Sequence, residues 1–123
     1  MKIKLFDSER KVMEVLWENG QLPAARIADI LGERIGWNKN TTYTVIKKCI
    51  EKGAIRRENP KFICYPVLTK AEAQRYEVTE MIDRLFDGSA KNLLASIFAG
   101  KAISGKEARE LKELIDQLEK ENQ

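Results

Sequence analysis

Apolar side chains recur at helical spacing in three segments of the first half of the chain, and this pattern predicts three short helices. The first predicted helix covers residues 7–18, with Asp7 or Ser8 as its cap. The second covers residues 24–31 and ends at Gly32, because glycine readily adopts the left-handed backbone that closes many helices. The apolar face of the first helix consists of Val12, Met13, Leu16 and Trp17.

The third predicted helix begins after Trp37 and ends at Gly53, with Asn38 or Asn40 as its cap. Its two faces differ in chemistry. The side facing the protein is predicted to consist of Thr42, Val45, Ile46 and Cys49. The opposite side is polar and basic, and it consists of Asn40, Thr41, Tyr43, Thr44, Lys47 and Lys48. We therefore expect one face to pack against the protein and the other to be free for a partner.

Two short β-type runs follow, over residues 54–57 and 62–67, and a turn sequence at residues 58–61 separates them. Together they predict a two-stranded hairpin. Pro66 lacks a backbone N–H and cannot donate to a neighbouring strand, so its run is predicted to be an edge strand. Three helices followed by a hairpin are typical of the winged form of the helix-turn-helix fold.

The second half of the chain predicts three more amphipathic helices. A Thr-x-x-Glu capping box at residues 69–72 begins a long helix that ends at about Phe86. A helix through residues 93–98 ends at Gly100. A second capping box, at residues 104–107, begins the last helix of the chain.

The apolar stripes of these C-terminal helices predict a dimerisation surface. Three amphipathic helices in about 55 residues cannot easily bury all of their apolar surface on one another. We expect an intertwined homodimer instead, and a small self-contained bundle is the alternative. The residues expected at the dimer contact are Met81, Ile82, Leu85, Phe86, Leu111, Leu114, Ile115 and Leu118.

The predicted fold is mostly α with a small β-hairpin wing. A winged helix-turn-helix DNA-binding domain covers residues 1–68, and a helical dimerisation region covers residues 69–123. Charge supports this division, because the first segment carries 13 Lys and Arg against 8 Asp and Glu, and the second carries 9 against 11. A positive first half joined to a slightly acidic second half is typical of a polyanion-binding head with a protein-contacting tail. An ordinary solvated surface is the alternative.

Composition argues against several classes of function. The chain has no run of roughly 18 apolar residues that would span a membrane, and its start lacks the apolar region of a signal peptide, so we expect a cytoplasmic protein. It contains no histidine, the commonest general base and metal ligand. It also contains no glycine-rich phosphate loop and no serine nucleophile elbow. We therefore expect neither an enzyme nor a metal site nor a cofactor.

The polar face of the third helix has chemistry suited to DNA. A B-DNA major groove is about 12 Å wide and admits one helix. The amide of Asn40 is suited to adenine, and the ammonium groups of Lys47 and Lys48 can reach guanine edges or phosphate. The other expected contacts are those of Thr41, Tyr43 and Thr44, through their hydroxyl groups, the tyrosine ring and the threonine methyls.

The predicted wing adds three basic residues. Arg56, Arg57 and Lys61 are placed to hold the DNA backbone or the minor groove. Each has an ordinary alternative, since arginines on a strand often pair with acidic residues across the hairpin. The prediction of DNA binding therefore depends on the whole set of residues in this order of elements.

Two alternatives to DNA binding remain open at this stage. A winged helix can also serve as a protein-interaction module that binds no DNA, with Tyr43 and the lysines contacting a partner protein. A thiol- or metal-responsive repressor is the second alternative, because Cys64 is predicted to be exposed on the wing, where a redox sensor would lie. Cys49 is expected to pack in the core as a small hydrophobic residue.

Several runs of sequence resemble one known family. They are the segments 37–46, 51–55 and 64–67, together with 14–17 in the first helix. In this order, and over nearly the whole chain, they are similar to the penicillinase repressor family, which includes the BlaI, MecI and CopY repressors. The resemblance implies a dimeric winged helix that blocks transcription at a palindromic operator, in a response to β-lactams or another stress.

The resemblance also implies routes of induction. In the β-lactam-responsive members, a membrane sensor with a metalloprotease domain triggers cleavage of the repressor at an Asn–Phe bond. The matching pair here is Ile97-Phe98, and the missing asparagine argues against proteolytic induction. Copper-responsive members carry C-terminal Cys-x-Cys pairs, and the absence of cysteine after Cys64 argues against copper or zinc sensing.

Overall fold

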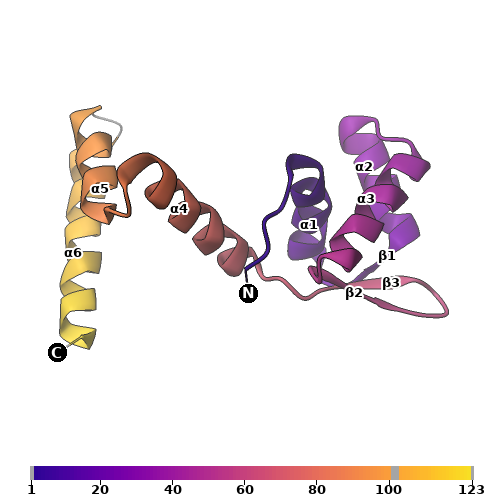
Figure 1. Ribbon diagram of the computed structural model, residues 1–123. Helices are drawn as coiled ribbons and strands as arrows, with labels where there is room; N and C mark the ends of the chain where they lie inside the picture. Colours follow the sequence, from indigo (N-terminus) through magenta and orange to yellow (C-terminus); the bar gives the residue numbers. More distant parts are fainter. Residues whose placement is uncertain (1, 101–102, 123) are drawn as a thin grey trace. The chain divides into compact units, whose positions relative to one another are not determined.

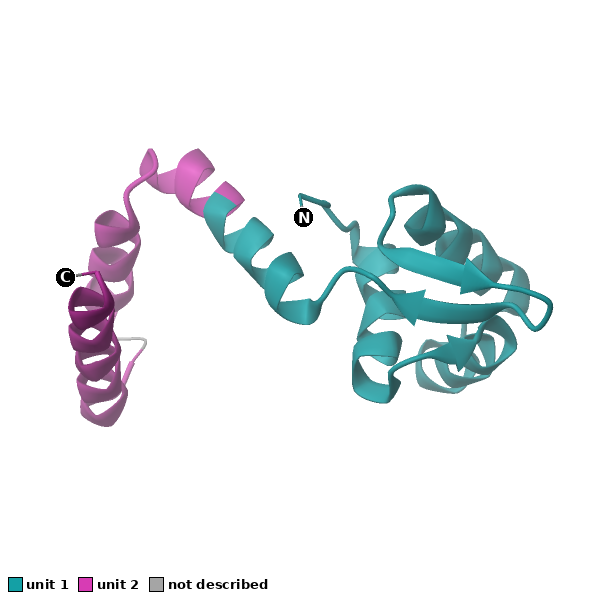
Figure 2. Ribbon diagram, turned by 90° about the horizontal axis from the view of Figure 1, so that it is seen from below, with its two compact units in different colours: residues 1–79 teal, residues 80–123 magenta. Residues whose placement is uncertain are grey.

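The computed structural model describes residues 2–100 and 103–122. The chain divides into two compact units, residues 1–79 and residues 80–123, which Figure 2 shows in different colours. Helix α4 (Lys70–Phe86) begins in the first unit and ends in the second. The first unit holds three further helices and a small sheet, and the elements of the second unit are helices (Figure 1).

Helix α1 (Asp7–Asn19) has a different cap from the predicted one. The N-cap residue is Phe6, so the assignment of the cap to Asp7 or Ser8 was wrong. The backbone N–H of Phe6 donates to Oε1 of Glu9 at 2.7 Å. A carboxylate that reaches back to the start of a helix satisfies a free backbone donor there, so no capping side chain is needed.

Helix α2 (Ala24–Ile35) continues past the glycine that was predicted to end it. Gly32 lies inside the helix, and the helix ends at Gly36, whose φ of 73° is left-handed. A glycine in a helix interior costs only about 1 kcal/mol relative to alanine. Burial of Ile27 and Leu31 on the inner face of α2 outweighs that cost.

Helix α3 (Lys39–Glu51) begins at Asn38, which settles the choice between the two predicted caps. The side-chain oxygen of Asn38 accepts a hydrogen bond from the backbone N–H of Thr41 at 2.8 Å. The predicted inner face is confirmed, because the buried residues of this helix are Thr42, Val45, Ile46 and Cys49.

The sheet has three antiparallel strands in the order β1-β3-β2: β1 (Leu22–Pro23), β2 (Ile55–Glu58) and β3 (Ile63–Pro66). The prediction that the run ending in Pro66 is an edge strand was therefore wrong, because β3 lies in the centre. Strand β1 pairs only with Ile63 and Cys64, so the missing N–H of the final proline of β3 is not needed on that side.

One hydrophobic core holds α1, α2, α3 and the sheet together. Met13 and Leu16 of α1, Ile27 of α2 and Ile46 of α3 are fully buried in it. The core also includes Cys64 from strand β3 of the sheet and Ala73 from the first turn of α4. Because three helices and the hairpin share these contacts, the outer face of α3 has a fixed position within this unit.

The remaining helices are α5 (Ala90–Ala99) and α6 (Gly105–Glu121). The predicted capping box at the start of α4 is confirmed, because the Thr69 hydroxyl accepts from the N–H of Glu72 and the N–H of Thr69 donates to Oε1 of Glu72, each at 3.1 Å. Of the second predicted box, the structure describes one half: the Ser104 hydroxyl, at the N-cap of α6, accepts from the N–H of Glu107 at 3.1 Å. No described residue from 80 to 122 is buried. Among the described residues, no helix combines the length and apolar character needed to cross a bilayer.

Candidate nucleic-acid interface

The outer face of α3 is polar, basic and open to solvent. The one hydrogen bond that its exposed side chains form within the described structure, apart from that of the cap, is local: the Thr44 hydroxyl donates to the backbone carbonyl of Asn40 at 2.9 Å. Lys47 and Lys48 form no ion pair with any described residue. The exposed residues of the predicted contact set on this helix are Asn40, Thr41, Thr44, Lys47 and Lys48.

Tyr43 has a different environment from these residues. It is half-buried, and its ring centroid lies 6.0 Å from that of Phe62, at the start of β3. Phe62 has a left-handed backbone with φ of 49°, and its carbonyl accepts from the N–H of Ala24 at 3.0 Å. Tyr43 therefore joins α3 to the hairpin, with only part of its surface left for a ligand.

The two arginines of β2 lie on opposite faces of the hairpin, because successive residues of a strand alternate. The guanidinium of Arg57 lies 3.5 Å from the centre of the Phe62 ring, and its Nε donates to Oδ1 of Asn59 at 2.9 Å. Arg57, Phe62 and Tyr43 thus form a continuous stack on the side of α3. This stack orients the guanidinium before any ligand arrives.

Arg56 is engaged on the other face of the hairpin. Its guanidinium pairs with the carboxylate of Glu58 and lies 4.2 Å from the centre of the Tyr65 ring. The hydrogen bond from Arg56 lowers the pKa of the Glu58 carboxyl, and the hydrogen bond to Glu58 raises the pKa of the Tyr65 hydroxyl. The structure therefore links Arg57 to Tyr43 of α3 through Phe62, whereas Arg56 lies on the opposite face of the hairpin. Lys61 is exposed in the turn between the strands.

The cysteines do not form an exposed thiol site. Cys64 is fully buried, so the prediction that it is exposed on the wing was wrong. Its side chain points into the core from the central strand, where the residue opposite it is Arg57. Burial raises the pKa of the Cys64 thiol to about 11 and that of the Cys49 thiol to about 12. A thiol with so high a pKa forms little of the thiolate that a redox sensor requires.

Two basic residues near the helix-turn-helix were absent from the predicted set. Lys39 lies in the first turn of α3 and Arg26 in α2, and both are exposed. Together with Asn38 they line a shallow hollow of about 440 Å³. The N-terminus of α3 also opens at this point, and the carboxylates of Asp29 and Glu33 line the same hollow, so the site carries charges of both signs. Helical spacing could have added Lys39 to the predicted contact set, because it lies one turn before Tyr43.

Within the described residues, no three His, Cys, Asp or Glu side chains lie close enough to hold a metal ion. The predicted cleavage pair lies in α5, with Ile97 half-buried and Phe98 exposed. The predicted dimer residues are all at least partly exposed. The exposed ones are Leu85, Leu114, Ile115 and Leu118, and the half-buried ones are Met81, Ile82, Phe86 and Leu111.

A sequence model of a known family, described as penicillinase repressor, matches residues 5–117 of the chain. The chain belongs to the penicillinase repressor family. The resemblance read from the sequence is thereby confirmed. Membership in this family makes the chain a DNA-binding transcriptional repressor, so the expectation that it is not an enzyme is also confirmed.

Individual relatives agree with this assignment. A penicillinase repressor of Bacillus licheniformis is 21% identical over 116 residues, which cover 93% of this chain and 91% of the relative. An uncharacterized 16.5 kDa protein of Latilactobacillus sakei, from the ptsI 3′ region, is 23% identical over 110 residues, covering 88% and 75%. The solution structure of the DNA-binding domain of the repressor BlaI matches with a TM-score of 0.54 and 22% identity, over 58% of this chain and 90% of that domain. This likeness confirms the predicted winged-helix fold.

Proposed function

We propose that this member of the penicillinase repressor family recognises a specific operator in double-stranded DNA through α3 and the β2–β3 hairpin. The observation that carries the proposal is the outer face of α3, where Lys47 and Lys48 are exposed and unpaired within the described structure while the inner face is locked in the core. A major groove admits such a helix, and its polar side chains are suited to base edges and phosphates.

Each part of the surface has a role in this proposal. Asn40, Thr41 and Thr44 face base edges near the start of α3, whereas Lys47 and Lys48 face phosphate or guanine. Arg57, held by the aromatic stack, reaches the backbone or the minor groove beside the helix, with Lys61 at the tip of the hairpin. Bound there, the protein would block transcription by occupying the promoter.

We further propose that the repressor is a homodimer held by the region from residue 69 onward, with residues 1–68 as the DNA-binding domain. The unit of residues 80–123 buries none of its described side chains, although α6 has a clear apolar stripe. A unit without a core is stabilised when a second copy covers its apolar faces. Two copies related by a two-fold axis also match a palindromic operator.

The cellular role and the signal are further parts of the proposal. A DNA-bound regulator acts in the cytoplasm, and the name of the Bacillus licheniformis relative supports a response to β-lactams or a similar stress. A membrane sensor with protease activity is a candidate partner by resemblance. Because Ile97 replaces the asparagine before Phe98, we expect a signal other than cleavage at this bond.

A fluorescence anisotropy titration tests operator recognition. A duplex selected by the full chain from a random pool is compared with a shuffled duplex at several salt concentrations. We expect at least about a thousandfold preference for the selected duplex. The logarithm of affinity should also fall by about 0.9 per phosphate contact for each unit of log salt. Equal binding to both duplexes would contradict the proposal.

The same titration with Lys47→Glu and Lys48→Glu combined identifies the reading face. We expect a loss of more than about tenfold in affinity, since two phosphate contacts are replaced by repulsion. The apparent mass in sedimentation equilibrium should stay unchanged. Unchanged DNA affinity would favour the alternative of a protein-interaction module, in which these lysines contact a partner protein.

A further inference from the structure

A buried carboxylate lies where the start of α1 meets the end of α3. Glu9 is 1% exposed, and its Oε1 accepts one hydrogen bond from the N–H of Phe6 at 2.7 Å and another from Nζ of Lys52 at 2.6 Å. A carboxylate removed from water is costly unless it has a charged or hydrogen-bonded partner. Lys52 supplies the charge, and the free N–H at the helix start supplies the second donor.

The described contacts of the Lys52 ammonium group are all with other residues of the protein. Lys52 is the C-cap residue of α3, the proposed recognition helix, so its side chain extends directly from the end of that helix. Besides Glu9, Nζ donates to the backbone carbonyl of Lys4 at 2.8 Å and lies 4.0 Å from the centre of the Phe6 ring. One ammonium group thus ties the end of α3 to α1 and to the N-terminal arm, defined as residues 2–6.

The other contacts of α3 with the core have a different character. They are mainly apolar side chains such as Val45 and Ile46, and burial of apolar surface has no preferred direction. The Lys52–Glu9 pair, in contrast, joins one specific donor to one specific acceptor at hydrogen-bond distance. Cys49, one turn earlier, adds a weak contact of 3.9 Å from its sulfur to the Glu9 carbonyl. The pair therefore adds a directional contact to the packed core at the end of α3, where it can fix the rotation of the helix about its own axis more closely.

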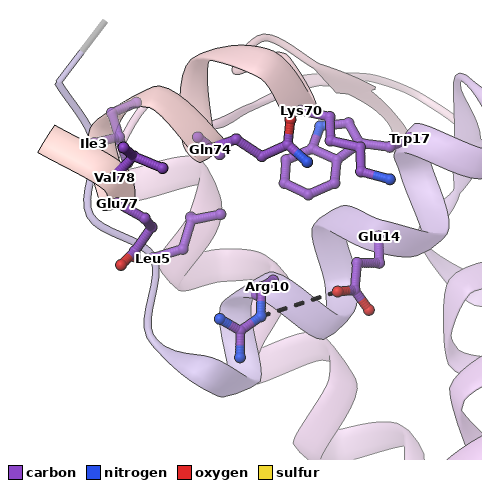
Figure 3. Close-up of a pocket in the computed structure, with 10 residues that line it drawn as sticks. Ile3, Leu5, Arg10, Glu14, Trp17, Lys70, Gln74, Glu77 and Val78 are labelled. Atoms are coloured by element: carbon purple, nitrogen blue, oxygen red, sulfur yellow. Dashed lines mark ion pairs between the residues drawn. The ribbon is translucent and has the colours of Figure 1, made fainter. Parts of the chain in front are cut away.

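The N-terminal arm is itself held on its other side. Ile3 and Leu5 line a hollow of about 290 Å³ between the arm, α1 and the first half of α4 (Figure 3). Leu5 is buried, and Val78 of α4 lines the same hollow as Ile3. The arm is thus an anchored segment, and the carbonyl that it presents to Lys52 has a defined position.

We infer that Lys52 is a positioning residue for the recognition helix. It fixes the orientation in which Asn40, Thr44 and Lys47 meet the bases, and it does not contact DNA itself. This role rests on the proposed binding of α3 in the major groove. In this role Lys52 differs from Lys48. Lys48 lies on the same helix, is exposed and has no ion pair with a described residue.

The test compares Lys52→Met with Lys48→Met as its matched control, in the full chain and with the selected and shuffled duplexes described above. Lys52→Met should lower the preference for the selected duplex about tenfold, the effect of losing one base contact, with an unchanged salt slope. Lys48→Met should reduce the salt slope by about 0.9, because its exposed ammonium group loses a contact with DNA phosphate whether or not it also reaches guanine. Lys52→Arg should restore the preference, because arginine keeps the charge and the donors.

Two outcomes with DNA would overturn the inference. One is a Lys52→Met variant with full preference for the selected duplex. The other is a salt slope that falls as it does for Lys48→Met, because Lys52 would then be a phosphate contact. If Lys52→Met does not fold, the double variant Glu9→Gln with Lys52→Met leaves no charge buried alone, and the same expectations apply to it.

Amide hydrogen exchange separates this inference from the proposed function. If no duplex is preferred by the wild-type chain, operator recognition fails, but the contact can still be tested. Exchange across α3, residues 39–51, should be faster in Lys52→Met than in the wild type and unchanged in Lys48→Met. Unchanged exchange in Lys52→Met would overturn the positioning role, whether or not the protein binds DNA.

Discussion

The two units of this chain differ in how far they bury their own apolar residues. Every fully buried hydrophobic residue of the described structure lies within residues 1–79, whereas none of the described residues of 80–123 is buried. The first unit therefore holds its shape by its own core. The second has regular helices and good caps but no core, so its stability depends on what covers it. Four sets of substitutions test this contrast.

The largest effect is expected in the core of the first unit. Leu16→Ala removes a fully buried side chain, and we expect the free energy of unfolding to fall by about 2–5 kcal/mol. Leu114→Ala, at an exposed site of α6, should change it by less than about 1 kcal/mol when the protein is dilute enough to be monomeric. Urea unfolding measures both. Equal losses would mean that both units have cores of their own.

The next effect concerns the proposed dimer. Leu114→Asp combined with Leu118→Asp places two charges in the apolar stripe of α6, and sedimentation equilibrium should then detect monomers. Affinity for a two-fold symmetric duplex should fall by about 100-fold, because the two DNA-binding units are no longer linked. Lys112→Asp, exposed on the same helix, is the control and should leave the dimer intact. A dimer that survives the double change would place its contact elsewhere.

A smaller effect separates the two arginines of the hairpin. Arg57→Ala should weaken DNA binding about tenfold, the value of one charge-assisted hydrogen bond. Arg56→Ala should weaken it much less, since that guanidinium already pairs with Glu58 on the opposite face. Anisotropy titrations at one salt concentration compare the two variants. The reverse order would show that the hairpin turns its other face to the duplex.

The smallest effect is expected at a single buried hydroxyl. Thr42 is fully buried, and its hydroxyl oxygen has no hydrogen-bond partner in the described structure. Thr42→Val keeps the shape and removes the polar group, so the free energy of unfolding should rise by up to about 1 kcal/mol. Thr41→Val, at the exposed neighbouring position, is the control. A clear loss of stability for Thr42→Val would mean that the hydroxyl has a partner in solution.

Much of the fold was predictable because its signals are local. Helical spacing of apolar residues identified the helices, and the inner face of α3 was predicted residue by residue. The errors came where tertiary packing outweighed a local rule. Gly32 lies within α2 because the residues around it are buried, and β3 is central because β1, only two residues long, pairs with its start.

The candidate site was predicted less completely. The outer face of α3 followed from helical geometry alone. The separation of Arg56 from Arg57 depends on the hairpin register, which pairs Arg57 with Cys64 and which the sequence does not state. The same register buries Cys64. The pairing of Glu9 with Lys52 joins residues 43 positions apart, and nothing in the local pattern indicates such a contact.

Lys52 and Arg56 each form an ion pair with an acidic residue of the protein itself. These pairs affect how DNA binding would depend on the concentration of salt. Of the seven basic residues between positions 38 and 61, these two are already neutralised by Glu9 and Glu58. If all seven met phosphates, a rise from 50 to 200 mM in intracellular ions would weaken binding about tenfold more than it does with five. With these two pairs intact, the proposed binding to DNA would therefore depend less steeply on salt than the number of basic residues alone implies.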